Sequence, residues 1–463
     1  MKQAILCIDI GSTNTKVTAI DTETPAILGT ASAYTTVETD VVNGLIRALK
    51  LLQEKTGPLK FTKRFACSSA AGGLRMIASG LAPSLTQTAA KMACLGAGAK
   101  VIQSYAYKLT KDDITEIFIQ KPDIFLLVGG TDGGNEEVVL HNAEMLSTQT
   151  PAFPIVYAGN RSAKDRVLEI LNGWDVRATE NVMPRLEHLN AAPVQEEIRT
   201  LFLEHIIHAK GLSDIAAQMD IPLIPTPSAV LLAMQLLADG TEDEHGIGEL
   251  VAVDLGGATT DVYSIAKGEP QIADAIAKGI PEPYAKRTVE GDIGMRYSAE
   301  GVLEAVGAEA LAQISGLDSE TLIEKIDFLR NHPDSLPKTE SDIAVDLSIA
   351  QSAVKVALTR HAGRLETIYT AQGPAIVQLG KDLTEIKHLI LTGGAIIHNP
   401  DAERIAKAAM FDSANPDTLK PKAAAVHIDT SYVLAACGLL SETNPKVALQ
   451  LMKKELTHNG THQ

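Results

Sequence analysis

The sequence predicts an α/β protein built from two related lobes. Its 463 residues exceed the ~250–300 residues at which a single hydrophobic core stops growing, so two or more lobes are expected. One pattern also occurs twice: residues 8–16 read IDIGSTNTK, and residues 253–261 read VDLGGATTD. Each copy places an apolar strand before Asp, Gly and a run of small or hydroxyl residues. Another strand-like run follows each copy, which predicts a hairpin in both lobes.

Both segments carry residues suited to binding a phosphate. Glycine lets backbone N–H groups approach an anion without an intervening Cβ atom, and hydroxyl side chains add donors. A carboxylate at the strand end, Asp9 or Asp254, can hold a hydrated Mg²⁺ that bridges phosphate oxygens. Lys16 can neutralise phosphate charge. Because single turns of this kind also occur in ordinary hairpins, the prediction rests on the two copies together.

Three further segments fit a nucleotide-binding protein of two lobes. Residues 389–395 read LILTGGA, a strand ending in Gly393 and Gly394, where bare backbone can pass against a nucleoside or its α-phosphate. Residues 224–240 and 429–440 are predicted helices rich in small residues, which allow close helix packing. We predict that these two helices form a hinge between the lobes. Ordinary core packing is the alternative for each of them taken singly.

The composition disfavours several classes of protein. The 41 basic residues are outnumbered by 57 acidic ones, for a net charge of −16, and aromatic residues make up 4%. Binding to a nucleic-acid backbone or to stacked bases is therefore not expected. The four cysteines lack metal-site spacing, which favours a reduced, cytoplasmic setting. Because no apolar run approaches the ~20 residues needed to cross a bilayer, no membrane association is expected.

The order hairpin, hinge helix, hairpin, Gly-Gly turn, hinge helix resembles the superfamily of actin, heat-shock chaperones and sugar kinases over essentially the full length. This resemblance implies a two-lobed actin-like ATPase with duplicated ribonuclease H-like lobes, and ATP and Mg²⁺ as cofactors. We expect residues 1–245 to form the first lobe with an inserted subdomain, in which 151–182 reads as a βαβ unit. Residues 246–400 should form the second lobe, with an outer helical subdomain over about 300–385. Residues 401–463 should form a C-terminal segment whose hinge helix returns to the lobe interface.

The resemblance also implies a set of site residues. Asp9 and Asp254 become the catalytic carboxylates, each near Mg²⁺ through water. The nucleotide contacts of the first lobe are Gly11, Ser12 and Thr13, with Thr15 and Lys16 added from the phosphate pattern. Those of the second lobe are Gly256, Gly257, Thr259 and Thr260, while Asp261 assists them or merely holds the hairpin. Gly393 and Gly394 face the nucleoside, and Glu290, Gly291 and Asp292 approach the nucleotide where the outer subdomain begins. Ala258 stands where chaperone ATPases often carry another glycine, which leaves the backbone path there open.

Five segments carry a closer resemblance: ACSSAAGGLRM (66–76), LVGGTDGGNEE (127–137), YAGNRSAKDRV (157–167), ENVMPRLEHLN (180–190) and RTVEGDIGMRYSAEG (287–301). They are similar to the glutamate mutase accessory proteins called MutL or GlmL. Membership implies an ATPase chaperone whose partner is an adenosylcobalamin-dependent mutase, of glutamate mutase or related aminomutase type. Such a protein hydrolyses ATP to expel damaged cobalamin from its partner. A homo-oligomer is left open.

Two rival functions share the scaffold. A small-molecule kinase would need a carboxylate acting as base on an alcohol, for which Asp132 is the candidate. An actin-like filament protein would need self-complementary surfaces. Fold alone does not choose among them.

Two further motifs stand outside this pattern. Residues 243–248 spell D-x-H-x-x-G, a pattern by which some B12 mutases offer a histidine to cobalt, and residues 129–134 form another Gly-rich turn. We interpret the first as coincidence. The second is either a third ligand-binding turn or a turn with a structural or partner-contacting role, and we favour the latter.

Overall fold

The computed structural model describes residues 2–11, 14–35, 41–69, 74–206, 212–371 and 373–457, without the side chains of residues 205, 206 and 457. The chain divides into two compact units. The first contains Met1–Leu232, Gly279–Pro281 and Ala435–Val447, and the second contains Ala233–Lys278, Glu282–Leu434 and Ala448–Gln463. The chain passes from one unit to the other within α9 (Thr226–Asp239), α16 (Leu434–Ser441) and α17 (Pro445–Thr457).

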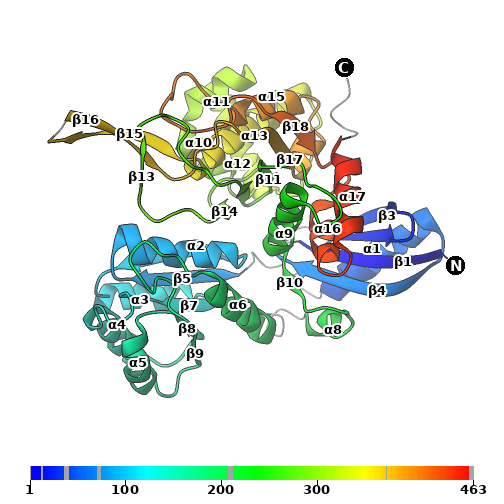
Figure 1. The fold of residues 1–463 in the computed structure, drawn as a ribbon. Helices are drawn as coiled ribbons and strands as arrows, with labels where there is room; N and C mark the ends of the chain where they lie inside the picture. Colours follow the sequence, from blue (N-terminus) through cyan, green and yellow to red (C-terminus); the bar gives the residue numbers. More distant parts are fainter. Residues whose placement is uncertain are drawn as a thin grey trace. The chain divides into compact units, whose positions relative to one another are not determined.

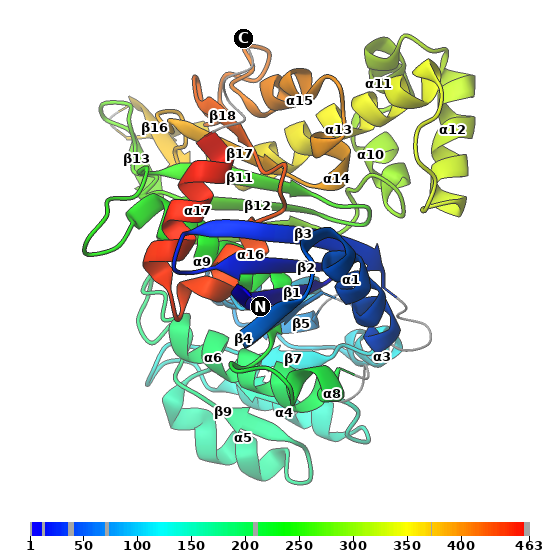
Figure 2. The same cartoon turned by 90° about the vertical axis from the view of Figure 1, so that its right-hand side faces the viewer.

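The first unit contains a five-stranded sheet in the order β10-β4-β1-β2-β3. The antiparallel neighbours β1, β2 and β3 lie side by side in Figure 2, with helix α1 against them. Strand β4 pairs with β1, and β10 with β4, in parallel. The bounds are β1 Lys2–Ile10, β2 Asn14–Asp21, β3 Ala26–Tyr34, α1 Val41–Thr56, β4 Leu59–Ser68 and β10 Ile224–Pro225. Strand β1 is central and mostly buried, as its apolar sequence predicts.

The second unit repeats this plan in the order β14-β12-β11-β17-β18. Numbered along the chain, both sheets have the strand order 3-2-1-4-5, with strands 1 to 3 antiparallel and strands 4 and 5 parallel to strand 1. The bounds are β11 Leu250–Leu255, β12 Thr260–Ile265, β14 Ala285–Glu290, β17 His388–Thr392 and β18 Ala425–Ile428. This is the order of a ribonuclease H-like lobe, so the predicted actin-like fold with duplicated lobes is confirmed.

The first unit also contains a parallel sheet in the order β6-β5-β7-β8-β9, a doubly wound arrangement with helices on both faces (Figure 1). The βαβ unit predicted at 151–182 is confirmed as β8, α5 and β9, but the sheet is larger and begins at β5. The bounds are β5 Arg75–Gly80, η2 Pro83–Gln87, α2 Thr88–Gly96, β6 Lys100–Ala106, α3 Lys111–Gln120, β7 Ile124–Leu127, α4 Glu137–Ser147, β8 Ile155–Tyr157, η3 Arg161–Ala163, α5 Lys164–Ile170 and β9 Val176–Ala178. Helix α6 (Ala192–Leu201), η4 (Phe202–Ile206) and α8 (Ser213–Ala216) follow.

The outer part of the second unit is only partly helical. Its helices are α10 Ala299–Val306, α11 Ala308–Ser315, α12 Ser319–Asn331 and α13 Glu340–His361. The expectation of helix up to about residue 385 is wrong for β15 (Arg364–Thr370) and β16 (Gly373–Leu379), which form a hairpin that pairs with β13 (Ile276–Lys278) and extends outward in Figure 1. The β-branched and aromatic run TIYT in β15 favours a strand. Helices α14 (Gly394–Ile397) and α15 (Ala402–Ala409) lie between β17 and β18 along the chain.

The two predicted hinge helices form, as α9 and α16, and part of each belongs to the first unit. There they touch: a Cβ atom added to Gly438 of α16 would lie 1.8 Å from the carbonyl oxygen of Ala229 in α9. Glycine at 438 is therefore required by close backbone approach. Among the described residues, no helix is both long and apolar enough to span a membrane.

Candidate functional site

The two predicted phosphate hairpins have the same construction. Gly11 N–H donates to the carbonyl oxygen of Asn14 at 3.0 Å, and Gly256 N–H donates to that of Thr259 at 2.9 Å. Each hydrogen bond closes a two-residue loop. A Cβ atom at Gly11 would lie 2.8 Å from Asn14 O, and one at Gly256 would lie 3.0 Å from Thr259 O. Glycine is thus needed at the same point of each hairpin, because the partner strand comes too close for a side chain.

Each hairpin has a loop of two residues, Ser12-Thr13 in the first and Gly257-Ala258 in the second. Ser12 and Thr13, predicted as phosphate contacts, lie outside the described residues. In the second hairpin the loop is Gly257-Ala258, and a Cβ atom at Gly257 would meet only the Arg296 side chain, at 3.8 Å. Gly257 is therefore not required by the hairpin itself.

Asp9 is fixed by two side chains from neighbouring strands and helices. Its Oδ1 accepts a hydrogen bond from Thr226 Oγ1 at 2.7 Å and one from Cys67 Sγ at 3.5 Å. Cys67 lies beside Asp9 on β4, and Thr226 begins α9. Burial, followed by the charge of Asp9, raises the pKa of the Cys67 thiol well above its ordinary value. The thiol consequently remains a neutral donor that orients the carboxylate.

Asp254 occupies the same strand end in the second unit, with a different residue opposite. Lys16 pairs with Asp9 across the first hairpin, whereas Asp261 pairs with Asp254 across the second. Two like charges directly opposite one another are unfavourable. Arg287 on β14 compensates: its Nε donates to Asp261 Oδ1 at 2.7 Å, and both side chains are buried. The structure thus favours the second reading of Asp261, as a residue that holds the hairpin.

Thr15 and Thr260 take a role other than the predicted one. They occupy equivalent positions, and both are fully buried. Thr15 Oγ1 shares a hydrogen bond of 2.9 Å with Thr35 Oγ1, and Thr260 Oγ1 donates to Ile293 O at 3.0 Å. Because both hydroxyls are committed inside the protein, we do not retain them as phosphate donors. Thr259 is half-buried, and its hydroxyl lies 3.4 Å from Asp261 Oδ2.

The segment after β14 braces the second hairpin. Met295 N–H donates to Gly256 O at 3.0 Å, and Arg296 N–H donates to Gly257 O at 2.8 Å. Arg296 in turn makes a bidentate ion pair with Asp346 of α13, at 3.0 and 2.9 Å. These bonds engage the carbonyl oxygens of Gly256 and Gly257, which leaves the N–H side of the hairpin as the side suited to an anion.

Glu290, Gly291 and Asp292 stand at the end of β14. Glu290 lies opposite Thr260 and pairs with Arg360 at 2.6 Å, while the exposed Asp292 lies 3.8 Å from the same guanidinium. Desolvation raises the pKa of Glu290 despite this pairing. The predicted trio thus adjoins the second hairpin through the strand, and its glutamate is already engaged by an arginine.

The Gly-Gly turn follows β17 directly. Gly393 has φ of 109°, and a Cβ atom there would lie 2.2 Å from Leu255 O. Since φ in this range is disfavoured for other residues, Gly393 is required by the path of the chain beside β11. Gly394 is more open, with the Tyr432 hydroxyl 3.1 Å from the position of an added Cβ. The turn therefore lies next to the end of β11, where Asp254 stands.

The Gly-rich turn at 129–134 is held together by side-chain hydrogen bonds. In the turn at 129–134, Asn160 Oδ1 accepts from Gly133 N at 3.0 Å, and Asn160 Nδ2 donates to Gly134 O at 3.1 Å. Asp132 Oδ1 accepts from Arg161 N and Asn181 Nδ2, both at 2.9 Å. These bonds give Asp132 a bracing role and weaken its candidacy as the base of a kinase.

The D-x-H-x-x-G segment is a tight turn after α9. A Cβ atom at Gly246 would lie 2.1 Å from Ala238 O, and His245 is exposed with its carbonyl bound by Lys453. Close packing therefore explains Gly246, whereas Gly248, the glycine of the motif itself, has a φ of 90° that glycine adopts readily. Among the described residues, no three His, Cys, Asp or Glu side chains group closely enough to hold a metal ion directly.

Comparison with known proteins identifies the family. A model of the family described as "MutL protein" matches residues 5–456. The chain belongs to this family. Protein MutL of Clostridium tetanomorphum is 46% identical over 457 residues, covering 98% of this chain and 99% of that protein. The family resemblance predicted from the five segments is thereby confirmed.

The chain is also similar to solved structures. One is the activator of the 2-hydroxyisocaproyl-CoA dehydratase from Clostridium difficile with bound ADPNP, at 10% identity and a TM-score of 0.31, covering 99% of this chain and 98% of that chain. Another is Plasmodium falciparum glycerol kinase with ADP, at 12% identity and a TM-score of 0.36, covering 98% and 92%.

Proposed function

We propose that this protein is an ATPase that reactivates an adenosylcobalamin-dependent mutase, of the glutamate mutase type or a related aminomutase, by driving release of damaged cobalamin. The observation that carries the nucleotide part is the duplicated hairpin: the same closing glycine, two-residue loop and strand-end aspartate in two sheets of identical strand order. Membership of the MutL family supports the mutase as partner.

The residues fit a nucleotide and a hydrated Mg²⁺. Each hairpin has its closing glycine beside a strand-end carboxylate, and the Gly257 position has space where a phosphate can approach. Mg²⁺ is typically held by one or two carboxylates together with waters and phosphates, which accords with one strand-end carboxylate in each hairpin. We propose that Asp9 and Asp254 orient this hydrated ion, which would supply charge neutralisation on the phosphates.

The remaining site residues have more limited proposed roles. We assign phosphate contacts to Gly11, Ser12, Thr13 and Lys16 in the first lobe and to Gly256, Gly257 and Thr259 in the second. We assign Gly393 and Gly394 to the nucleoside or its α-phosphate. Glu290, Gly291 and Asp292 are assigned a position at the end of β14 from which they approach the nucleotide. Asp261, Thr15 and Thr260 support the hairpins from within.

The deciding experiment is ATP hydrolysis by the purified protein, with and without a mutase inactivated by bound damaged cobalamin. We expect basal hydrolysis, stimulation by the inactivated mutase, and recovery of mutase activity that requires ATP. Phosphorylation of a small alcohol or acid, without any effect on a corrinoid enzyme, would replace the proposal with a kinase.

A second experiment tests whether nucleotide turnover drives the partner. ATP and ADP should favour different conformations to the extent that their affinities for those conformations differ. We expect a non-hydrolysable ATP analogue to support at most one round of reactivation. Ala435→Leu, in helix α16, should leave ATP binding intact while reactivation falls. Repeated reactivation with the analogue contradicts the cycling mechanism.

A further inference from the structure

Tyr432 has a backbone conformation that is uncommon for an aromatic residue. Its φ is 52°, in the left-handed region, and its side chain is half-buried. Non-glycine residues in this region persist when the surrounding structure holds them there, and they concentrate at functional sites. Tyr432 lies in the turn between β18 and α16, within the segment 429–440 that the sequence predicts as a helix.

The turn is held by the buried Asp429. Its carboxylate accepts from Val433 N at 2.9 Å, from Leu434 N at 3.4 Å, and from Thr392 Oγ1 at 3.2 Å. Tyr432 N–H donates to the Asp429 carbonyl at 3.2 Å. Thr392 is the last residue of β17 and lies opposite Asp254. The strained tyrosine is thus fastened to the strand end that precedes the Gly-Gly turn.

The phenol of Tyr432 points to the candidate site. Its hydroxyl lies 3.1 Å from where a Cβ atom on Gly394 would be, so any side chain at 394 would press on it. Burial, and then the charges of Asp254 and Asp429, raise the pKa of Tyr432 to about 12. The group therefore remains a neutral O–H at physiological pH, where it can donate a hydrogen bond to an anion without adding charge.

We propose that the Tyr432 hydroxyl donates a hydrogen bond to a phosphate group of the nucleotide bound at the Gly393–Gly394 turn. This inference rests on the proposed function and adds a residue to it. The missing side chain at Gly394 and the strained backbone at Tyr432 then have one common explanation: together they place a donor beside Asp254, where the phosphates would lie. At the corresponding connection of the first lobe, Thr226 donates its hydroxyl to Asp9.

The test compares two Tyr→Phe variants by titration calorimetry with ATP, ADP and adenosine. Tyr432→Phe removes the hydroxyl and keeps the ring. Tyr284→Phe is the matched control, because it removes a hydroxyl bonded to Asp239 at 2.6 Å elsewhere in the second unit. We expect Tyr432→Phe to weaken ATP and ADP binding about tenfold, the usual effect of losing a hydrogen bond to a charged acceptor. Adenosine binding and the melting temperature of the nucleotide-free protein should be unchanged, and Tyr284→Phe should bind ATP like the wild type.

Other outcomes overturn the assignment. Equal ATP affinity in Tyr432→Phe and wild type would leave the hydroxyl without a role in nucleotide binding. An equal loss for ATP and adenosine would place it on the nucleoside. Tyr432→Gly, whose backbone suits positive φ, keeps the test valid if Tyr432→Phe folds poorly, and it should show the same preference for phosphate-bearing ligands. If the wild-type protein binds neither ATP nor ADP, the proposed function fails and this inference fails with it.

Discussion

The first and second hairpins share a backbone and differ in charge. Both close with glycine and carry an aspartate at the end of the central strand, but Lys16 lies opposite Asp9 while Asp261 lies opposite Asp254. The second hairpin consequently needs the buried Arg287, supplied by the neighbouring strand. The two copies of the fold therefore share the path of the backbone, but the charged residues around the strand-end aspartate differ between them.

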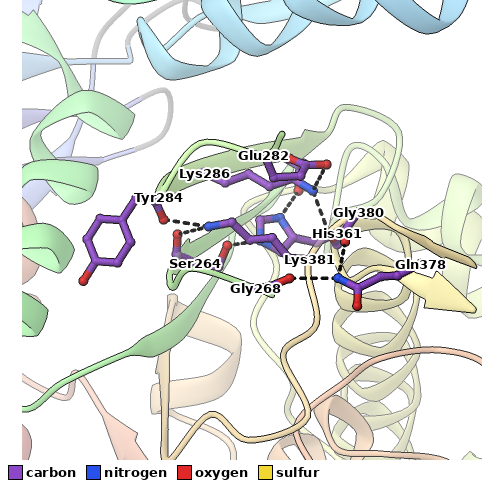
Figure 3. A network of polar contacts seen from close by, with 10 residues as sticks. Ser264, Gly268, Glu282, Tyr284, Lys286, His361, Gln378, Gly380 and Lys381 are labelled. Atoms are coloured by element: carbon purple, nitrogen blue, oxygen red, sulfur yellow. Dashed lines mark hydrogen bonds and ion pairs between the residues drawn. The ribbon is translucent and has the colours of Figure 1, made fainter. Parts of the chain in front are cut away.

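The two units also differ in how they bury basic groups. Among the described residues, the buried lysine and arginine side chains, Arg287, Lys381 and Lys420, all lie in the second unit. Figure 3 shows one such region, where Lys381 Nζ donates to Tyr284 O at 2.6 Å and His361 Nε2 contacts Ser264 Oγ at 2.8 Å. This network lies on the face of β12 opposite to Asp261, so that strand carries buried polar groups on both faces.

The largest expected effect is the loss of ATP hydrolysis when a strand-end aspartate is replaced. Asp254→Asn should reduce ATP hydrolysis by ~10²–10³, the usual loss on removing one well-placed electrostatic group, with the melting temperature unchanged. Steady-state hydrolysis assays measure this, with Asp327→Asn, an exposed carboxylate on α12, as control. Hydrolysis within a few-fold of wild type would remove Asp254 from the mechanism. Asp9→Asn tests the other copy, and an effect in only one lobe would show that the duplicated carboxylates act unequally.

Arg287→Met should instead destabilise the protein. It leaves the buried Asp261 without its partner, and breaking a buried ion pair in this way costs about 3–5 kcal/mol. Chemical denaturation followed by circular dichroism measures the change. The double variant Arg287→Met/Asp261→Asn should recover part of the loss, because no unpaired charge remains. Arg330→Met, on the surface of α12, should leave stability unchanged, and an equal loss there would contradict the importance of burial.

Glycine variants distinguish space for a ligand from space for the hairpin. Gly257→Val should weaken ATP binding about tenfold or more without lowering the melting temperature, because its Cβ meets only Arg296 at ordinary contact distance. Gly11→Ala should lower both the affinity for ATP and the melting temperature, since its Cβ would lie 2.8 Å from Asn14 O. Unaltered ATP affinity in Gly257→Val would exclude the second hairpin from phosphate binding.

The last expected effect is a pH dependence of stability that arises in the second unit. Burial lowers the pKa of Lys381 to about 7, against an ordinary value of 10.5, so between these values the unfolded chain binds a proton that the folded chain lacks. Stability should therefore rise with pH from 7 towards 10, by at most about 1.4 kcal/mol per pH unit from this group. Lys286, Glu282 and Glu249 also act on Lys381.

Lys381→Met should flatten this rise in denaturation curves recorded at pH 7, 8 and 9. His361 contributes separately and at lower pH: burial holds its pKa well below 6.5, so its contribution to stability declines as pH falls below 6.5 towards the pKa of the folded state. The Lys381→Met variant should still lose stability below pH 6.5. If stability rises between pH 7 and 9 as steeply in the variant as in the wild type, Lys381 is charged in the folded protein.

The sequence by itself determined the local features of this protein. The two hairpins, their closing glycines, the Gly-Gly turn after a strand and the small-residue helices were all predictable, because each depends on the conformational limits of a few consecutive residues. The family was predictable for a similar reason, since long segments such as residues 287–301 carry their similarity in residue order alone.

Tertiary structure decided which polar groups are available for a ligand. Arg287 reaches Asp261 through strand pairing, and Thr15 and Thr260 are buried by neighbours that sequence spacing does not reveal. Tyr432 lies beside Gly394 only because β17 and β18 pair in parallel. In the inserted sheet, β8 and β9 have three residues each, and the state of such short segments depends on their pairing partners. Burial and strand partners are long-range properties, so residues with the same local pattern acquire different roles once the chain has folded.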